Sequence, residues 1–105
     1  MAWLYLILAG LGEVVWAIAL KQSASFTRFW PSVITVVALL ASFYLLTLAF
    51  RHIPTGVAYA IWTGIGAVGV ALVSFVWMGE TLTLMRWASI GLIVLGMIGL
   101  KMGGP

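Results

Sequence analysis

The sequence predicts an all-α integral membrane protein whose chain crosses the bilayer four times. Of its 105 residues, 65% are hydrophobic and only 7% are charged, whereas soluble domains carry about 25% charged residues. Four long apolar stretches alternate with short polar ones, and about 20 apolar residues are enough for a helix to cross a bilayer. The predicted helices span residues 2–20, 31–50, 55–78 and 84–102, so that residues 1–105 form a single transmembrane domain.

Short polar segments set the ends of these helices. The first apolar stretch lacks a basic start and contains Glu13, so we expect a retained helix rather than a signal peptide. After the polar loop of residues 21–28, Pro31 suits the first position of the second helix, where its missing N–H is not needed. A turn at residues 51–54 and a loop at residues 79–83 separate the remaining helices.

The polar residues argue against several classes of protein. The net charge is +3, but the five basic residues stand singly near helix ends, where they suit lipid headgroups rather than nucleic acid. There is no cysteine, and the single histidine, His52, lies in a turn beside Pro54. The sequence contains no metal-binding constellation, nucleophile motif or phosphate-binding loop. We therefore expect no enzyme, metal or cofactor.

Glu13 is the residue that most directly suggests a function. At 1.5 Å per residue it lies roughly 16 Å from Ala2 along the first helix, about half the ~30 Å thickness of the hydrocarbon core. A charge at that depth costs about 2.5 kcal/mol or more, so such residues usually face an interior cavity and act there. A structural glutamate paired with a cation is the alternative, but no Lys or Arg of this chain lies at midplane depth.

Three small or aromatic residues share a helix face with Glu13. Trp16 follows it by three positions, and Gly10 and Ala17 complete the strip. Small residues there leave room for a ligand or for a closely packed neighbouring helix.

Three further side chains reach similar depths on other helices. Tyr59, Trp62 and Glu13 lie progressively deeper from one side of the membrane, and Ser42 lies near the midplane of the second helix. A phenol, an indole N–H and a hydroxyl can therefore surround one carboxylate, which needs donors when buried. The alternatives are that Ser42 bonds a carbonyl of its own helix and that both aromatic rings face lipid.

Glycines mark two other positions of interest. Gly64 and Gly66 lie in the middle of the third helix and predict either a hinge or close packing against another helix. On the fourth helix, Ser89 and Gly96 are two turns apart, and small residues at that spacing predict a face for self-association.

The loop charges give almost no preferred orientation in the membrane. Lys21, Arg28 and Arg86 lie on one side, and Arg51 and Lys101 lie on the other. The chain can therefore insert both ways, and two opposed copies would recreate the inverted repeat of larger transporters. Two Glu13 carboxylates would then face one cavity.

The whole chain also resembles the small multidrug resistance family of four-helix, proton-coupled exporters. The motifs that carry this resemblance are Gly12–Lys21, Phe26–Arg28 with Trp30–Ser32, and Ile53–Trp62 followed by Gly64–Gly66. Within the family, the segment around Trp16 is similar to that of the guanidinium-exporter subtype. The resemblance implies an antiparallel, dual-topology homodimer in a bacterial inner membrane.

The resemblance also implies roles for the residues named above. Glu13 would bind protons and guanidinium in alternation. The site would be shaped and hydrogen-bonded by Trp16, Ser42 and Trp62, and Tyr59 would gate access. Two alternatives stay open: an exporter of bulky quaternary or aromatic cations, and a non-transporting accessory membrane protein with a protonated, packed Glu13.

Overall fold

The computed structural model describes residues 1–103 of the chain and confirms the all-α fold with four helices. Each helix is long and apolar enough to cross a membrane. In chain order they are α1 (Ala2–Gln22), α2 (Phe29–Phe50), α3 (Thr55–Trp77) and α4 (Leu84–Met102). The largest differences from the predicted bounds are two residues: α1 ends two residues later than predicted, and α2 begins two residues before Pro31. Proline is tolerated there because the first four N–H groups of a helix have no partner within it.

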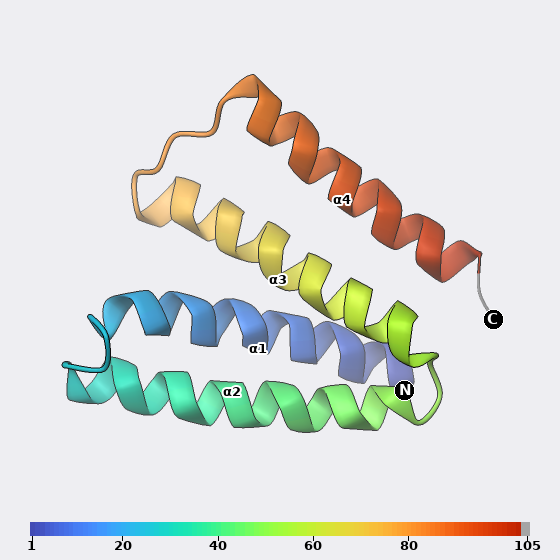
Figure 1. The fold of residues 1–105 in the computed structure, drawn as a ribbon, viewed down its shortest axis with the longest axis horizontal. Coiled ribbons are helices and arrows are strands. Elements are labelled where there is room, and N and C mark those ends of the chain that lie inside the picture. The colour runs from blue at the N-terminus through green and yellow to red at the C-terminus, as the bar shows by residue number, and fades with distance from the viewer. Residues whose placement is uncertain (104–105) are drawn as a thin grey trace.

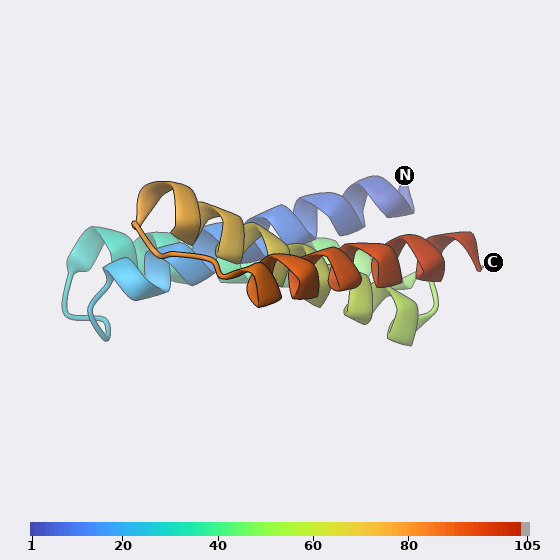
Figure 2. The same cartoon turned by 90° about the horizontal axis from the view of Figure 1, so that it is seen from above.

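The four helices lie side by side in the order α2, α1, α3, α4, as Figure 1 shows. The chain is flat, with extents of 43 × 35 × 17 Å, and Figure 2 shows this thin layer edge-on. The start of α1, the end of α4 and the α2–α3 turn lie at one end of the layer, and the other two loops lie opposite. A layer this thin leaves its two broad faces to lipid or to another protein chain.

The buried core lies between α1, α2 and α3. Its fully buried members are mostly small or compact, such as Leu6, Ala9, Ala49 and Ala58. Lipid tails are as apolar as leucine, so association in a membrane depends on close packing rather than on the hydrophobic effect. Alanine at these positions lets the helix backbones approach one another. By contrast none of the residues of α4, all of which the structure describes, is buried.

The loop between α1 and α2 makes a left-handed turn that the sequence does not predict. Ala24, Ser25 and Phe26 have φ angles of 48°, 63° and 66°, a region that costs roughly 1–2 kcal/mol per residue for side chains other than glycine. The buried hydroxyl of Ser23 donates to the carbonyl of Leu20 at 2.6 Å and accepts from the N–H of Phe26 at 3.1 Å. These bonds offset part of the strain.

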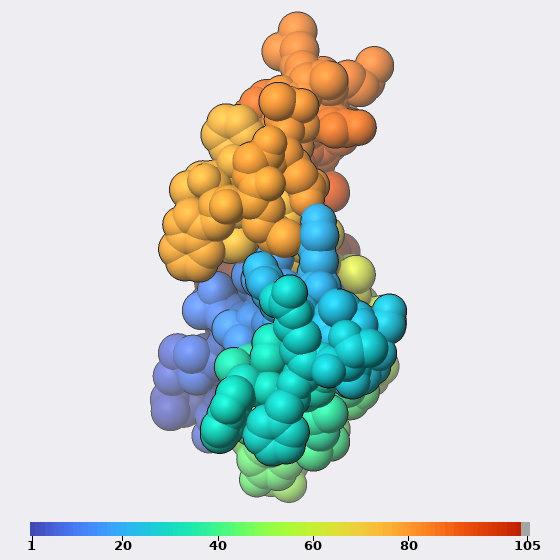
Figure 3. All heavy atoms as spheres, turned by 90° about the vertical axis from the view of Figure 1, so that its left-hand side faces the viewer, coloured from blue at the N-terminus to red at the C-terminus, as the bar shows by residue number. Residues whose placement is uncertain are grey.

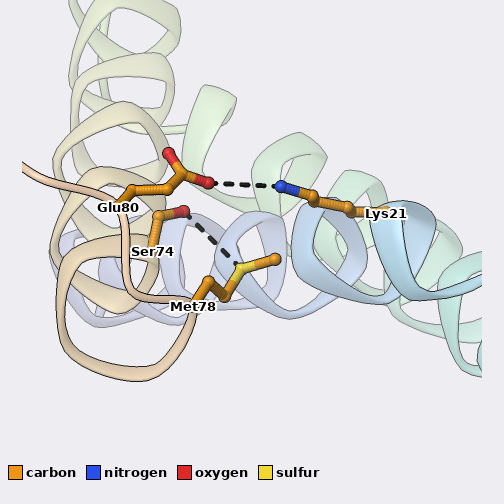
Figure 4. Close-up of polar contacts among 4 residues, drawn as sticks. All are labelled: Lys21, Ser74, Met78 and Glu80. Atoms are coloured by element: carbon orange, nitrogen blue, oxygen red, sulfur yellow. Dashed lines mark hydrogen bonds and ion pairs between the residues drawn. The ribbon is translucent and has the colours of Figure 1, made fainter.

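An exposed ion pair joins the end of α1 to the α3–α4 loop at this end of the molecule. The Nζ of Lys21 lies 3.2 Å from a carboxylate oxygen of Glu80, with both side chains at least half exposed (63% and 50%). Figure 4 shows this pair beside the weak bond from the Ser74 hydroxyl to the Met78 sulfur, 3.8 Å long. In Figure 3 the orange atoms around the α3–α4 loop meet the blue atoms at the end of α1. A surface pair of this kind contributes about 0–1 kcal/mol.

Candidate functional site

Glu13 lies halfway along α1 and faces α3 at Gly66. A Cβ atom added at Gly66 would lie 2.5 Å from Oε1 of Glu13 and 2.8 Å from its Cγ, and it would overlap Cδ. The carboxyl group therefore occupies the space that any side chain at position 66 would need. Glycine at this position is what allows the acid to lie between the two helices.

The structure leaves two buried polar atoms near this point without hydrogen-bond partners. Oε2 of Glu13 and Nε1 of Trp16 are both buried, and neither has a partner among residues 1–103. Buried polar atoms are normally hydrogen-bonded, and an exception calls for an explanation such as a ligand or a functional role. Because the two residues are three positions apart, they share a face of α1. One acceptor and one donor without a partner among residues 1–103 thus belong to side chains on the same face of α1, about one turn apart.

Ser42 and Trp62 meet on α1, but one turn away from the carboxyl. The Ser42 hydroxyl donates to the carbonyl oxygen of Ala9 at 2.6 Å. The Trp62 indole N–H lies 3.2 Å from the same oxygen and 3.0 Å from the Ser42 hydroxyl oxygen, both within hydrogen-bond distance. The sequence predicted that these donors would converge on the Glu13 carboxylate. In this structure they instead meet at the backbone carbonyl of Ala9, because the two side chains reach α1 one turn before Glu13.

The contacts between α1 and α3 at this site lie on two levels, one helical turn apart. Ala9 precedes Glu13 by four residues and Trp62 precedes Gly66 by four, so each pair lies one turn apart on one helix face. Trp62 meets Ala9 on the first level, and Gly66 meets Glu13 on the second. Sequence depth alone did not reveal the Ala9 carbonyl, because every residue of a helix carries one.

Tyr59 lies at the edge of this site rather than inside it. Its side chain is 53% exposed, and its ring centroid is 5.4 Å from that of Trp62. The ring of Phe43 approaches Trp62 from α2, with centroids 5.6 Å apart. Trp62 itself is buried, so it does not face lipid. The indole thus has two aromatic neighbours, Phe43 and Tyr59, and both of these residues are exposed on the surface of the chain.

The small residues of the predicted site take part in close helix packing. Gly10 is buried, and a Cβ there would lie 2.6 Å from a methyl group of Ile65. Ala17 is partly exposed. Gly64 is buried, and a Cβ there would lie 2.6 Å from the sulfur of Met97 on α4.

The middle of α3 is continuous in this structure. The helix runs unbroken from Thr55 to Trp77, and both Gly64 and Gly66 lie at contacts with other helices. These contacts support the close-packing interpretation of the two glycines. The hinge stays a prediction.

The predicted self-association face of α4 is uncovered within the chain. Ser89 and Gly96 are both exposed, and nothing lies within 4 Å of a Cβ built at Gly96. The Ser89 hydroxyl donates to the carbonyl of Met85 in the same helix, at 2.8 Å. This face is therefore free to contact a second chain.

Comparison with known proteins identifies the family. The sequence model described as "Small Multidrug Resistance protein" matches residues 1–93. The chain belongs to the small multidrug resistance family. A protein named "Guanidinium exporter" from Yersinia pseudotuberculosis serotype I (strain IP32953) is 55% identical over 102 residues, which cover 97% of this chain and 98% of the relative. Proteins of the same name from Escherichia coli (strain K12) and Citrobacter freundii are 55% and 52% identical, with 97% of both chains covered in each case.

Family membership also settles the class of protein and its location. The relatives are named as exporters, so this family member is a membrane transport protein rather than an enzyme. Its relatives are bacterial, and its four helices can each cross a membrane. It is therefore a multi-pass protein of a bacterial inner membrane.

Proposed function

We propose that the protein exports guanidinium and small guanidinyl cations in exchange for protons. The observation that carries the proposal is the buried, unpartnered carboxyl oxygen of Glu13 in the middle of a membrane-spanning helix. The names of the relatives at 52–55% identity support the choice of substrate. An acid in this position that pairs with no basic side chain among residues 1–103 is available to pair with a cation.

Guanidinium suits a carboxylate chemically. The ion is planar, stays charged at neutral pH and presents paired N–H donors that match two carboxylate oxygens. Glu13 is the acceptor in this proposal, and Trp16, on the same face of α1, shapes the site beside it. Ser42 and Trp62, one turn away, shape the site and supply hydrogen bonds, while the exposed ring of Tyr59 gates access.

Exchange follows from competition for one acid. A protonated Glu13 is neutral and has lost its attraction for a cation, whereas an ionised Glu13 binds one. Guanidinium therefore enters only when the proton leaves, and the proton returns only when guanidinium leaves. If the loaded site opens to one side of the membrane at a time, this exclusion couples the two gradients.

The proposed active form is an antiparallel homodimer. A flat layer of helices leaves its two broad faces uncovered, and the uncovered Ser89–Gly96 face of α4 offers a contact surface. Opposed copies place two Glu13 carboxyls toward one cavity. Gly96→Leu tests the contact, because the open space around Gly96 predicts an unchanged helical content and a weaker dimer. A dimer that persists unchanged in this variant would contradict the assignment of this face.

Transport in proteoliposomes tests the function. Radiolabelled guanidinium should accumulate against an imposed pH gradient, and Glu13→Gln should abolish accumulation while leaving the fold intact. Glu80→Gln is the matched control, because it removes the other acidic side chain of the chain at an exposed loop. Uptake that survives in Glu13→Gln would refute the mechanism and favour a packed, structural glutamate.

One observation favours a second candidate substrate class. A pocket of about 300 Å³ lies between α2 and α3 beside the proposed site, lined by Phe43, Leu46, Thr47, Phe50, Tyr59 and Trp62. Aromatic walls attract bulky quaternary or aromatic cations. Competition of large cations against radiolabelled guanidinium distinguishes the two classes, since a guanidinium exporter should be only weakly inhibited by them.

A further inference from the structure

A cavity outside the proposed transport site opens at the end of the layer where α1 begins and α4 ends. It has a volume of about 630 Å³ and lies between the α2–α3 turn, the start of α1 and the end of α4. The residues that give it a polar character are His52 and Lys101, and Trp3 and Pro54 line its walls. Helix ends of this kind lie at the level of the lipid headgroups.

An apolar groove continues from this cavity toward the middle of the membrane. The two share Trp3 and Lys101 at their junction. The groove has a volume of about 210 Å³, and it is lined by Ile7, Ile61, Ile65, Val94, Met97 and Ile98. Successive turns of α1 and α4 line it at increasing distance from the helix ends. The combined space thus has a polar mouth and a narrow hydrocarbon interior.

The mouth of this space carries positive charge without an acidic side chain to neutralise it. The Nζ of Lys101 lies 5.1 Å from the ring centroid of Trp3. The chain has only two acidic side chains: Glu13 is in the middle of α1, and Glu80 pairs with Lys21 at the opposite end. An anion placed at the mouth would therefore meet Lys101 without competition from an acidic side chain.

We propose that this space binds one anionic phospholipid, with its phosphate at Lys101 and an acyl chain in the groove. A positively charged mouth above an apolar groove matches the charge and the shape of such a lipid, and indole rings favour the headgroup level. A free phosphate ion would use only the mouth and would leave the groove unfilled.

The proposed lipid site is compatible with the proposed dimer contact. With 3.6 residues per turn, the groove residues of α4 centre roughly 140° away from the stripe of Ser89 and Gly96. The groove-lining positions Val94, Ile98 and Lys101 therefore face away from that stripe. A second chain bound at the stripe leaves the groove open to lipid.

Counting retained lipids tests the headgroup part of the proposal. The full chain in mild detergent is mixed with phosphatidylglycerol or with phosphatidylcholine of the same acyl chains, and bound lipid is measured by native mass spectrometry. Phosphatidylglycerol should bind in preference, and Lys101→Gln should weaken it about fivefold, the contribution of one lysine at an anionic surface. Arg28→Gln is the matched control, since Arg28 lies at the opposite end of the layer, and should change nothing.

A second pair of variants tests the groove. Val94→Trp fills the groove from α4 and should reduce lipid binding, whereas Leu95→Trp adds the same bulk to a neighbouring exposed position outside the groove. Three results would each overturn the proposal. The two lipids could be retained equally, Lys101→Gln and Arg28→Gln could have the same effect, or excess inorganic phosphate could displace the lipid. The Lys101→Gln comparison stands even if Val94→Trp fails to fold.

Discussion

Replacing Gly66 with alanine puts a methyl group where the Glu13 carboxyl now lies. The added Cβ would lie 2.5 Å from Oε1 and 2.8 Å from Cγ of Glu13, whereas non-bonded carbon atoms settle at about 3.5–4.0 Å. The carboxyl must therefore move by roughly 1 Å. Because it is the end of a flexible side chain, we expect it to turn aside while the two helices stay in place.

The expected loss is in ligand binding rather than in stability. Alanine favours a helix over glycine by about 1 kcal/mol, which offsets part of the roughly 1–3 kcal/mol cost of overpacking. A displaced carboxyl loses at least one charge-assisted hydrogen bond to guanidinium, about 1.5–3 kcal/mol. Gly66→Ala should then weaken guanidinium binding roughly 10- to 100-fold, as measured by calorimetric titration of the purified protein.

Gly69→Ala is the matched control for this prediction. A Cβ at Gly69 would overlap a methyl group of Val14 at the same α1–α3 contact, away from the carboxyl. The Gly69→Ala substitution brings the same gain in helix propensity and a similar packing cost as Gly66→Ala. The temperature of thermal unfolding should therefore change by a similar amount in both variants. Guanidinium binding should stay close to that of the unaltered protein. Equal losses of binding in the two variants would show that helix packing, and not the position of Glu13, explains the effect.

Three further predictions follow from the contacts described above. Ser42→Ala removes one donor to the Ala9 carbonyl and should lower the stability by about 0.6–1 kcal/mol in chemical unfolding; an unchanged stability would argue against that bond. Lys21→Gln breaks only an exposed pair with Glu80, so thermal unfolding should show a change within about 0.5 kcal/mol, and less at high salt; a larger loss would contradict a surface role. If guanidinium displaces one proton from Glu13, the dissociation constant of guanidinium should rise about tenfold for each pH unit below the pKa of that acid. Binding titrations at several pH values measure this dependence. A dissociation constant that does not change with pH would exclude competition.

Much of the fold was accessible from the sequence because bilayer thickness and hydropathy fix the helices. The four membrane-spanning segments were predicted to within two residues at every end, since charges and prolines mark their limits. The left-handed turn at Ala24–Phe26 was not predicted, because none of its residues normally favours positive φ. Neither could the sequence place α4, which packs along α3 at one edge of the layer and has no buried residue.

The site was predictable in its depth but not in its contacts. The depths of Glu13, Ser42 and Trp62 follow from counting residues, but the direction of a side chain depends on how neighbouring helices rotate against each other. Ser42 and Trp62 therefore reach α1 as expected but bond the carbonyl of Ala9. A glycine in the sequence predicts close approach, but only the structure shows that the group approaching Gly66 is the carboxyl itself.

Proton release on guanidinium binding is the most direct test of the proposed exchange. Purified protein in weakly buffered detergent solution is mixed with guanidinium, and the released protons are followed with a pH-sensitive dye. We predict a release that saturates with guanidinium and is absent in Glu13→Gln. Guanidinium binding without proton release, or an undiminished release from Glu13→Gln, would contradict competition at this acid.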